Sequence, residues 1–267
     1  MSRRLTILAG SGALVPEIIS GAKAAGDEVQ VLPLVDRADL GLEESFGVAD
    51  LPKLLWRITS FRTTHVTMVG GLKASSGDRE AFKRFARAGG SSGDAALLKI
   101  AEKLLAMTGA KVVGAEAIVP GILAGRGNLA GPVPAPALLA VASRALDTAR
   151  AIGRLDVGQA VIVSPSRVIA VEDVAGTDAL LRRVAAYLVD GLDPGEPLVL
   201  AKALKPQQSR LVDRPAIGPQ TVHNAAAAGI SIIALEADGA ILIDRPGIEA
   251  AAQQHGISVI GMDGDGG

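Results

Sequence analysis

The stretch that decides the fold class is Leu5-Thr6-Ile7-Leu8-Ala9-Gly10-Ser11-Gly12-Ala13-Leu14-Val15-Pro16. It opens with an apolar run typical of a buried strand, and the run ends at a turn rich in glycine. Because proline favours the first turn of a helix, we predict a helix over residues 16–25, followed by a second strand over 28–35. A strand, a helix and a strand in this order are typical of an α/β fold with a parallel sheet.

The same alternation continues along the chain of 267 residues, which is long enough for two domains. Two apolar runs, 160–163 and 168–171, are separated by Ser164-Pro165-Ser166-Arg167 and predict a hairpin. We therefore expect a Rossmann-like N-terminal domain and a second α/β domain with a mixed sheet. The other predicted helices are 51–57, 80–87, 94–108, 137–152, 178–189 and 219–228, and the other strands are 65–69, 111–115, 198–200, 230–235, 240–243 and 257–260.

The boundary between the domains is predicted at Gly131-Pro132-Val133-Pro134-Ala135-Pro136. Three prolines remove backbone donors and favour extended backbone, so this segment is typical of a stiff connector. We place the N-terminal domain at 1–133 and the C-terminal domain, with its charged residues, at 134–267. The halves are expected to close on substrate about this connector.

Composition excludes several classes of protein. Hydrophobic residues make up 49% of the chain and aromatic residues 2%, which predicts an aliphatic core. A net charge of -1 offers no field for a polyanion, so no nucleic-acid partner is expected. The absence of cysteine fits a reducing cytoplasm. The longest uncharged stretch, 127–143, contains three prolines and predicts no membrane-spanning helix.

Two loops are candidates for binding a phosphate. Gly10, Ser11, Gly12 and Ala13 lie between a strand and a helix, where free N–H groups and the helix dipole favour an anion. Gly70-Gly71-Leu72-Lys73-Ala74 follows another strand and should open on the same edge of the sheet. The alternatives are a tight turn that needs small residues and, for Lys73, an ordinary solvated lysine.

Acidic residues gather after the predicted hairpin. Glu172 and Asp173 directly follow a strand, Thr177 and Asp178 come soon after, and Gln159 precedes the hairpin. Carboxylates grouped in this way suit a hard divalent cation that bridges phosphates. The alternative is a polar loop in which Thr177 or Asp178 caps the next helix.

A mixed cluster of charges follows, which could clamp a diphosphate while Asp213 orients water or a metal ion. An ordinary charged surface is the alternative. The cluster consists of Lys202, Lys205, Arg210, Asp213 and Arg214. The three histidines, His65, His223 and His255, do not have the spacing of a metal site.

Four segments together resemble one family: residues 8–14, 156–163, 170–183, with the pattern Glu-x-x-x-Gly-Thr-Asp, and 205–222. The chain resembles the UDP-2,3-diacylglucosamine pyrophosphatases of lipid A synthesis that are unrelated to calcineurin-like phosphoesterases. The resemblance implies a two-domain enzyme that hydrolyses this lipid-linked nucleotide sugar to UMP and 2,3-diacylglucosamine 1-phosphate with a divalent cation, Mg²⁺. It also implies a cytoplasmic protein on the surface of the inner membrane, with an apolar pocket for acyl chains and a homodimer as one option.

Site residues follow from the resemblance. Those expected to bind substrate are Gly10, Ser11, Gly12, Ala13, Lys73, Ala74, Gln159, Thr177, Asp178 and Arg210. The expected catalytic residues are Asp213, Asp173, Glu172, Lys205 and the position of Ala225, and the first three are also expected to hold the metal.

The chain departs from the family pattern at two places. Residues 205–210 lack the acid expected before Arg210, and Ala225 stands where an acidic residue is expected. We therefore expect Ala225 to impair activity. Two other functions stay open: an NAD(P)-linked oxidoreductase, against which Val15 argues because the dinucleotide fingerprint needs glycine there, and a nucleotide- or lipid-binding regulatory protein.

Overall fold

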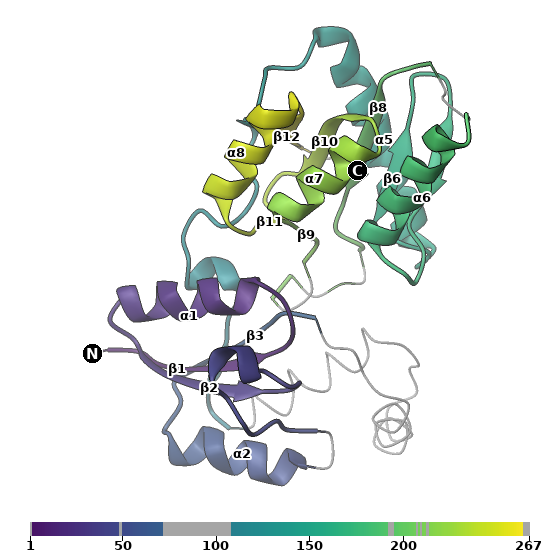
Figure 1. Cartoon of the computed structure of the whole chain (residues 1–267). Helices are drawn as coiled ribbons and strands as arrows, with labels where there is room; N and C mark the ends of the chain where they lie inside the picture. The colour runs from purple at the N-terminus through teal and green to yellow at the C-terminus, as the bar shows by residue number, and fades with distance from the viewer. Residues whose placement is uncertain are drawn as a thin grey trace. The chain divides into compact units, whose positions relative to one another are not determined.

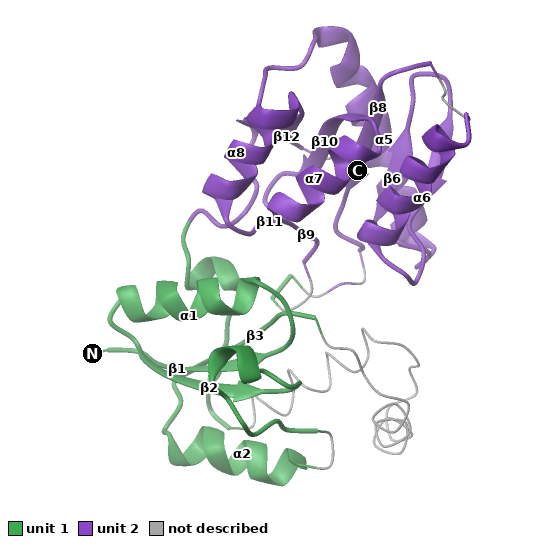
Figure 2. Ribbon diagram, viewed as in Figure 1, with its two compact units in different colours: residues 1–120, 209–213 green, residues 121–208, 214–267 purple. Residues whose placement is uncertain are grey.

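The computed structural model describes residues 2–47, 50–71, 108–191, 195–206, 208, 210–211 and 214–263. The chain divides into two compact units (Figure 2). Unit 1 comprises residues 1–120 and 209–213, and unit 2 comprises residues 121–208 and 214–267. Each unit has its own sheet with helices between the strands, which confirms the predicted α/β class.

Unit 1 is built on a four-stranded parallel sheet of order β2-β1-β3-β4. Its strands are β1 Arg4–Ala9, β2 Glu28–Pro33, β3 His65–Val69 and β4 Lys111–Val112. The predicted strand at 111–115 is shorter than expected because the 3₁₀ helix η3, Ala115–Ala117, follows it. A second 3₁₀ helix, η1 Ala38–Leu40, follows β2.

The helices α1, Leu14–Ala24, and α2, Leu51–Ser60, lie on opposite faces of this sheet (Figure 1). Apolar side chains of alternate strand residues, including Leu8 and Val66, pack against Leu54 and Ile58 of α2. Both faces of the sheet are thus covered, as parallel sheets require. The predicted helix at 80–87, and all but the last residue of the predicted helix at 94–108, lie outside the described residues.

Unit 2 is built on a six-stranded mixed sheet of order β5-β12-β10-β8-β6-β7. The strands β8, β10 and β12 are parallel, whereas β6 runs antiparallel to both β7 and β8, which confirms the predicted hairpin. The strands are β5 Gly127–Ala130, β6 Ala160–Val163, β7 Val168–Val171, β8 Leu198–Lys202, β10 Ile230–Glu236 and β12 Ser258–Met262. A separate parallel pair is formed by β9 Ala216–Ile217 and β11 Ile241–Leu242.

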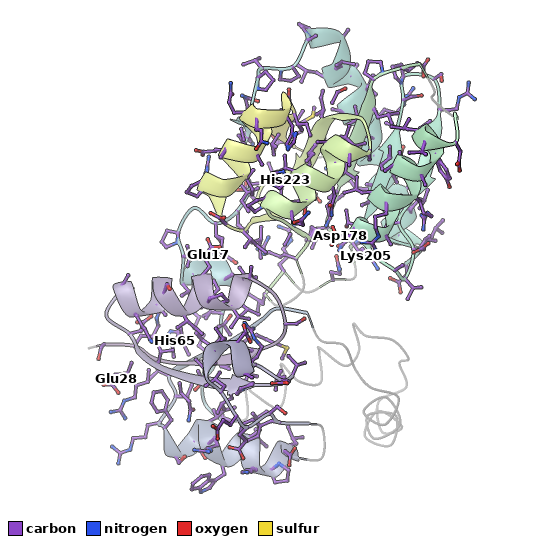
Figure 3. All side chains as sticks on the ribbon, in the orientation of Figure 1. Glu17, Glu28, His65, Asp178, Lys205 and His223 are labelled. Carbon is purple, nitrogen blue, oxygen red and sulfur yellow. The ribbon has the colours of Figure 1, made fainter. Side chains whose placement is uncertain are left out.

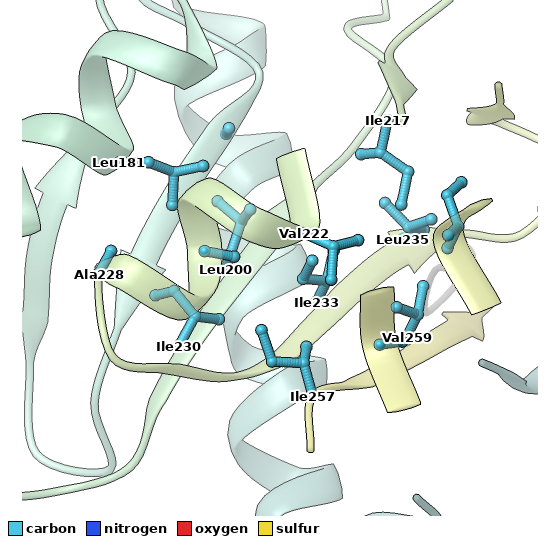
Figure 4. Close-up of a cluster of buried hydrophobic side chains, with 14 of the residues drawn as sticks. Leu181, Leu200, Ile217, Val222, Ala228, Ile230, Ile233, Leu235, Ile257 and Val259 are labelled. Carbon is cyan, nitrogen blue, oxygen red and sulfur yellow. The ribbon is translucent and has the colours of Figure 1, made fainter. Parts of the chain in front are cut away.

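Helices cover both faces of the second sheet. Leu200 of β8 lies in a core cluster with residues of α6 Thr177–Val189, α7 Pro219–Ala227 and α8 Arg245–His255 (Figure 4). The neighbouring Val199 and Ala201 belong to the cluster under α5, Pro136–Arg154. Both clusters are dominated by Ala, Val, Leu and Ile, as composition predicts.

The proline-rich connector does not join the two units. The strand β5 precedes the connector and pairs with β12, so residues 127–130 already belong to unit 2. The units divide between residues 120 and 121, whereas the sequence analysis placed the boundary between 133 and 134. The connector links β5 to α5 inside unit 2, and the predicted hinge at this point is therefore wrong.

Among the described strands and α-helices, β5, β9 and α8 were not predicted, nor were the two 3₁₀ helices. Within the described residues, no helix combines the length and the apolar character needed to cross a bilayer.

Candidate functional site

The turn after β1 and the loop after β3 are hydrogen-bonded to each other. Ser11 N donates to Gly71 O at 2.9 Å, and Gly71 N donates to Ser11 O at 2.9 Å. Gly10 N also donates to Val69 O at 2.8 Å. The structure thus brings the two predicted phosphate-binding loops together as far as Gly71, while Lys73 and Ala74 lie outside the described residues.

Glycine is required where these two loops meet. A Cβ atom on Gly10 would lie 2.7 Å from Gly71 O, and one on Gly70 would lie 2.5 Å from Ser11 O. Gly70 also has φ +90, a conformation that other residues rarely adopt. Any side chain at either position would therefore separate the loops.

A buried arginine that the sequence analysis missed lies behind the turn. Arg37 is 4% exposed, its Nη1 donates to Gly10 O at 2.6 Å, and its Nε and Nη2 each donate to the Asp39 carboxylate at 2.8 Å. The hydrogen bond with Asp39 raises the pKa of Arg37 and lowers the pKa of Asp39. Arg37 is thus a fixed cation that supports the turn, and no spacing in the sequence marked it.

The turn itself is open to a ligand. Ser11, Gly12 and Ala13 are exposed, and Ala13, the N-cap of α1, makes no side-chain capping bond. The first N–H groups of a helix and its dipole favour an anion. The geometry therefore suits a phosphate group, as the sequence predicts.

In unit 2, several polar residues meet at one edge of the sheet. Lys202 ends β8 and pairs with Ala160 of the antiparallel β6, so Gln159, just before β6, lies at the same edge. Glu172 follows β7 and also lies there, because its N–H donates to Ala160 O at 2.9 Å. We call Gln159, Glu172, Thr177, Asp178 and Lys202 the Glu172 cluster. The carboxyl ends of parallel strands, here β8 and β10, are where ligands bind in α/β folds.

Glu172 connects the elements of this cluster. It is 5% exposed; its Oε2 accepts from Gln159 N–H at 2.7 Å and its Oε1 accepts from Thr177 Oγ1 at 2.6 Å. Both carboxylate oxygens are therefore engaged within the protein. Glu172 fixes the start of β6 to the start of α6.

Lys202 is the buried cation of the cluster. Its Nζ donates to Ala216 O at 3.0 Å, and its side chain is almost fully covered. Desolvation lowers the pKa of Lys202, and the nearby charges of Glu172 and Asp178 oppose this shift. Asp178 itself lies at the start of α6 and accepts from Asn224 Nδ2 at 3.1 Å, which links α6 to α7 (Figure 3).

Gln159 leaves an unused acceptor in the cluster. Its backbone is fixed, since its N–H donates to Glu172 and its carbonyl accepts from Ala203 N–H at 3.0 Å. Its side-chain Oε1 is buried and has no hydrogen-bond partner among the described residues. A buried, unpaired amide oxygen is costly, so this atom is suited to a ligand donor.

Asp173 lies outside this network, and its carboxylate binds groups of the loop after β7 and of α6. It accepts from Ala175 N–H at 2.8 Å and pairs with Arg183, and both interactions lower the pKa of Asp173. Neither Glu172 nor Asp173 thus has a carboxylate oxygen without a protein donor. Among the described residues, no group of three His, Asp or Glu side chains is placed to hold a metal ion. The third predicted metal ligand, Asp213, lies outside the described residues, so the metal site stays a prediction.

Models of two protein domains match consecutive parts of the chain. The LpxI N-terminal domain matches residues 4–122 and the LpxI C-terminal domain matches residues 125–260. The chain belongs to the LpxI family. The gap between the two matches lies close to the boundary between units 1 and 2.

A relative of known function supports this assignment. The chain is 36% identical over 276 residues to the UDP-2,3-diacylglucosamine pyrophosphatase LpxI of Caulobacter vibrioides, and the match covers 98% of each chain. The family resemblance is thereby confirmed. The oxidoreductase alternative is not favoured.

The described cations of the predicted diphosphate clamp in this LpxI family member have different partners. Lys205, labelled in Figure 3, pairs through Nζ with Asp156 Oδ1 at 2.9 Å. Arg214 Nη1 donates to Asp238 O at 2.6 Å. Arg210 is exposed and belongs to the short segment 209–213 of unit 1. Asp213 lies outside the described residues. Within unit 2, Lys202 belongs to the Glu172 cluster, whereas Lys205 and Arg214 have the partners given above.

Ala225 does not occupy a catalytic position. It lies on α7 with 0% exposure, in the same core cluster as Val222 and Leu200. An aspartate there would place a carboxylate among apolar side chains. The structure thus argues against the expectation that Ala225 replaces a catalytic acid, and a small apolar residue is what this helix needs.

A pocket of about 420 Å³ runs along β2 in unit 1. It is lined by Leu32, Pro33 and Phe46 but also by Glu44 and Arg57, and it contains none of the predicted site residues. The expected acyl-chain pocket therefore stays a prediction.

Proposed function

We propose that this protein hydrolyses UDP-2,3-diacylglucosamine to UMP and 2,3-diacylglucosamine 1-phosphate in lipid A synthesis. The observation that carries the proposal is the match to the Caulobacter vibrioides pyrophosphatase over 98% of both chains, because it includes both units. Hydrolysis of a diphosphate needs groups that bind the charged phosphates and a base or acid near the attacking water.

The structure supports a division of these tasks. Gly12, Ala13 and the first turn of α1 offer backbone N–H groups and the helix dipole to a phosphate, and Arg37 holds the carbonyl of the preceding Gly10. The unpaired Gln159 Oε1 offers an acceptor to a sugar hydroxyl or a base N–H. Since Glu172 and Asp173 are engaged within the protein, Asp213 is the acid that we propose to act on water.

The test is release of UMP from UDP-2,3-diacylglucosamine by the purified protein with Mg²⁺. We expect turnover by the natural sequence, and Asp213→Asn should lower it by about 100-fold or more, as loss of acid–base catalysis does. Asp190→Asn, at the exposed end of α6, is the matched control and should keep full activity. Intact lipid and no UMP above the blank with the natural protein would overturn the proposal.

Dependence on a divalent cation is a second proposal, supported by the diphosphate chemistry of the substrate. A chelator should abolish activity, and added Mg²⁺ should restore it. Glu172→Gln and Asp173→Asn should not change the Mg²⁺ concentration that gives half-maximal activity, because these carboxylates already accept protein donors. A large change in this Mg²⁺ concentration for either variant would indicate that the substituted residue binds the metal.

We further propose that the protein works on the membrane surface, with two loops beside the Glu172 cluster against the bilayer. Leu155 is 76% exposed, Val157 is 51% exposed, and Val174 is fully exposed. The loops adjoin, since a Cβ atom on Gly158 would lie 2.4 Å from Glu172 O. Exposed aliphatic side chains on neighbouring loops can enter the boundary between headgroups and acyl chains.

Sedimentation with vesicles that contain anionic phospholipid tests this surface. Replacing Leu155, Val157 and Val174 together with serine should reduce binding, whereas Val133→Ser and Val189→Ser, at similarly exposed positions elsewhere, should not. Equal reductions in both sets would contradict the assignment. The homodimer rests on the family resemblance alone, and light scattering of the protein decides it.

A further inference from the structure

Two histidines from different helices face each other on the surface of unit 2. His223 Nδ1 of α7 lies 2.9 Å from His255 Nε2 of α8. The ring centroids are 5.1 Å apart and the ring planes are at 89°. Both side chains are exposed. Because 32 residues separate the two positions, no sequence spacing indicated the pair.

The distance between the two nitrogens is suited to one shared metal ion. Two nitrogens that share an ion with metal–nitrogen bonds of about 2.0–2.1 Å lie about 2.9–3.4 Å apart, so the two rings are already close enough to reach one ion after rotation. Imidazole nitrogen is a good ligand for Cu²⁺ and Ni²⁺, and among divalent first-row ions Cu²⁺ generally binds nitrogen ligands most tightly.

The surroundings favour a cation at this point. His255 is the last residue of α8, where the helix dipole is negative. In the present geometry the rings share a hydrogen bond, so each ring must rotate to direct its lone pair at the ion. Exposure of both rings leaves room for this rotation.

We propose that His223 and His255 form a two-histidine site for a divalent transition-metal ion, Cu²⁺ or Ni²⁺, that joins α7 to α8. The site is independent of the proposed hydrolysis. No third histidine or carboxylate completes it in the part of the chain that the structure describes. The remaining coordination positions are thus open to water.

Titration of the untagged protein with Cu²⁺, followed by electron paramagnetic resonance and by thermal unfolding, tests the site. We expect one site with coupling to two imidazole nitrogens and a higher Tm when the ion is bound, since the ion binds only the folded arrangement. His223→Ala and His255→Ala should each weaken binding by about tenfold or more, because each removes one of two linked ligands.

The chain provides its own control. It has three histidines and no cysteine, so His65 of unit 1 is the only other imidazole, and His65→Ala should bind Cu²⁺ like the natural protein. His223→Gln and His255→Gln keep a hydrogen-bonding side chain but should lose the rise in Tm. Equal Cu²⁺ affinity of the natural protein and the double alanine variant would overturn the proposal, as would loss of binding on His65→Ala.

Discussion

Arg37, Glu172 and Lys202 are charged side chains that the fold buries, and each lies at the functional edge of its sheet. Burial of a charge costs free energy unless the charge is paired or hydrogen-bonded. Arg37 pairs with Asp39 and donates to the Gly10 carbonyl. Glu172 accepts hydrogen bonds from Gln159 N–H and Thr177 Oγ1. Lys202 donates to the Ala216 carbonyl and lies near the charges of Glu172 and Asp178. We interpret these costly residues as the framework that positions the ligand-binding loops.

Lys202 should make the free energy of unfolding depend on pH in the alkaline range. Burial lowers its pKa from 10.5, so between the lowered pKa and 10.5 the unfolded chain binds more protons than the folded chain. The contribution of Lys202 to the free energy of unfolding therefore rises with pH in this window. The difference in that free energy, natural protein minus Lys202→Met, should increase from about pH 7 to about pH 10 in urea unfolding. Lys23→Met, an exposed lysine, should show no such trend, and a flat difference for Lys202→Met would refute the prediction.

Arg37 should act as a positioning residue for substrate binding. Loss of its charged hydrogen bond to Gly10 O is worth about 1.5–3 kcal/mol, so Arg37→Met should raise KM by about tenfold with a smaller effect on kcat. Arg37→Lys should recover part of the loss because it keeps the charge. Steady-state kinetics measures both. A fall in kcat alone, with KM unchanged, would mean that Arg37 does not support the binding turn.

At the scale of secondary-structure elements, the strands were the most predictable part. The apolar runs that form β1, β3, β6 and β7 match the predicted strands because each is bounded by turn residues, and all but the partly exposed edge strand β7 are buried on a sheet. The strands β5 and β9 were not predictable, since they form through pairing with β12 and β11, far along the chain.

The helix α8 was missed because its residues, rich in Ala and Gln, give a weak apolar stripe. Its ends nevertheless carry signals: Asp244 at the N-cap, Pro246 in the first turn, and Gly256 with φ 65 after the last residue. In the site, strand order predicted that the two loops lie together, and the sequence grouped Gln159, Glu172, Thr177 and Asp178. Lys202 was expected in a different cluster. Arg37 and the histidine pair were not predicted, because these contacts are made between residues distant in the sequence.

The N-cap of α8 should contribute measurably to stability. The Asp244 side chain accepts from Gly247 N–H at 3.1 Å, and Asp244 has φ 54. Asp244→Ala should lower the free energy of unfolding by about 1 kcal/mol, because it removes the cap and places alanine in a left-handed conformation. Asp244→Asn, which caps equally well and tolerates this backbone, should stay within about 0.5 kcal/mol of the natural protein. Urea unfolding measures both variants, and an alanine variant as stable as asparagine would contradict the role.

At the scale of the whole molecule, two separate cores predict two unfolding events. Ile58 belongs to the core of unit 1 and Ala225 to that of unit 2, and both have 0% exposure. Ile58→Val should lower the Tm of one calorimetric transition, and Ala225→Asp should lower the Tm of the other by more, because it buries a charge. A single transition that both variants shift equally would show that the units unfold together. The domain boundary was predicted at the wrong place because the prolines of residues 132–136 are a local signal. The pairing of β5 with β12, which are far apart in the sequence, places this connector in unit 2.

Unit 1 is formed by two separate stretches of the chain, and this has a consequence for protein synthesis. Residues 209–213 belong to unit 1, although residues 121–208 of unit 2 precede them in the chain. A ribosome therefore releases most of unit 1 long before it releases the segment that completes it, whereas most domains fold in order as they emerge. Unit 1 is therefore without these residues while residues 121–208 of unit 2 are being made. Asp213, the proposed catalytic acid, is the last residue of this segment and is synthesised after the rest of unit 1.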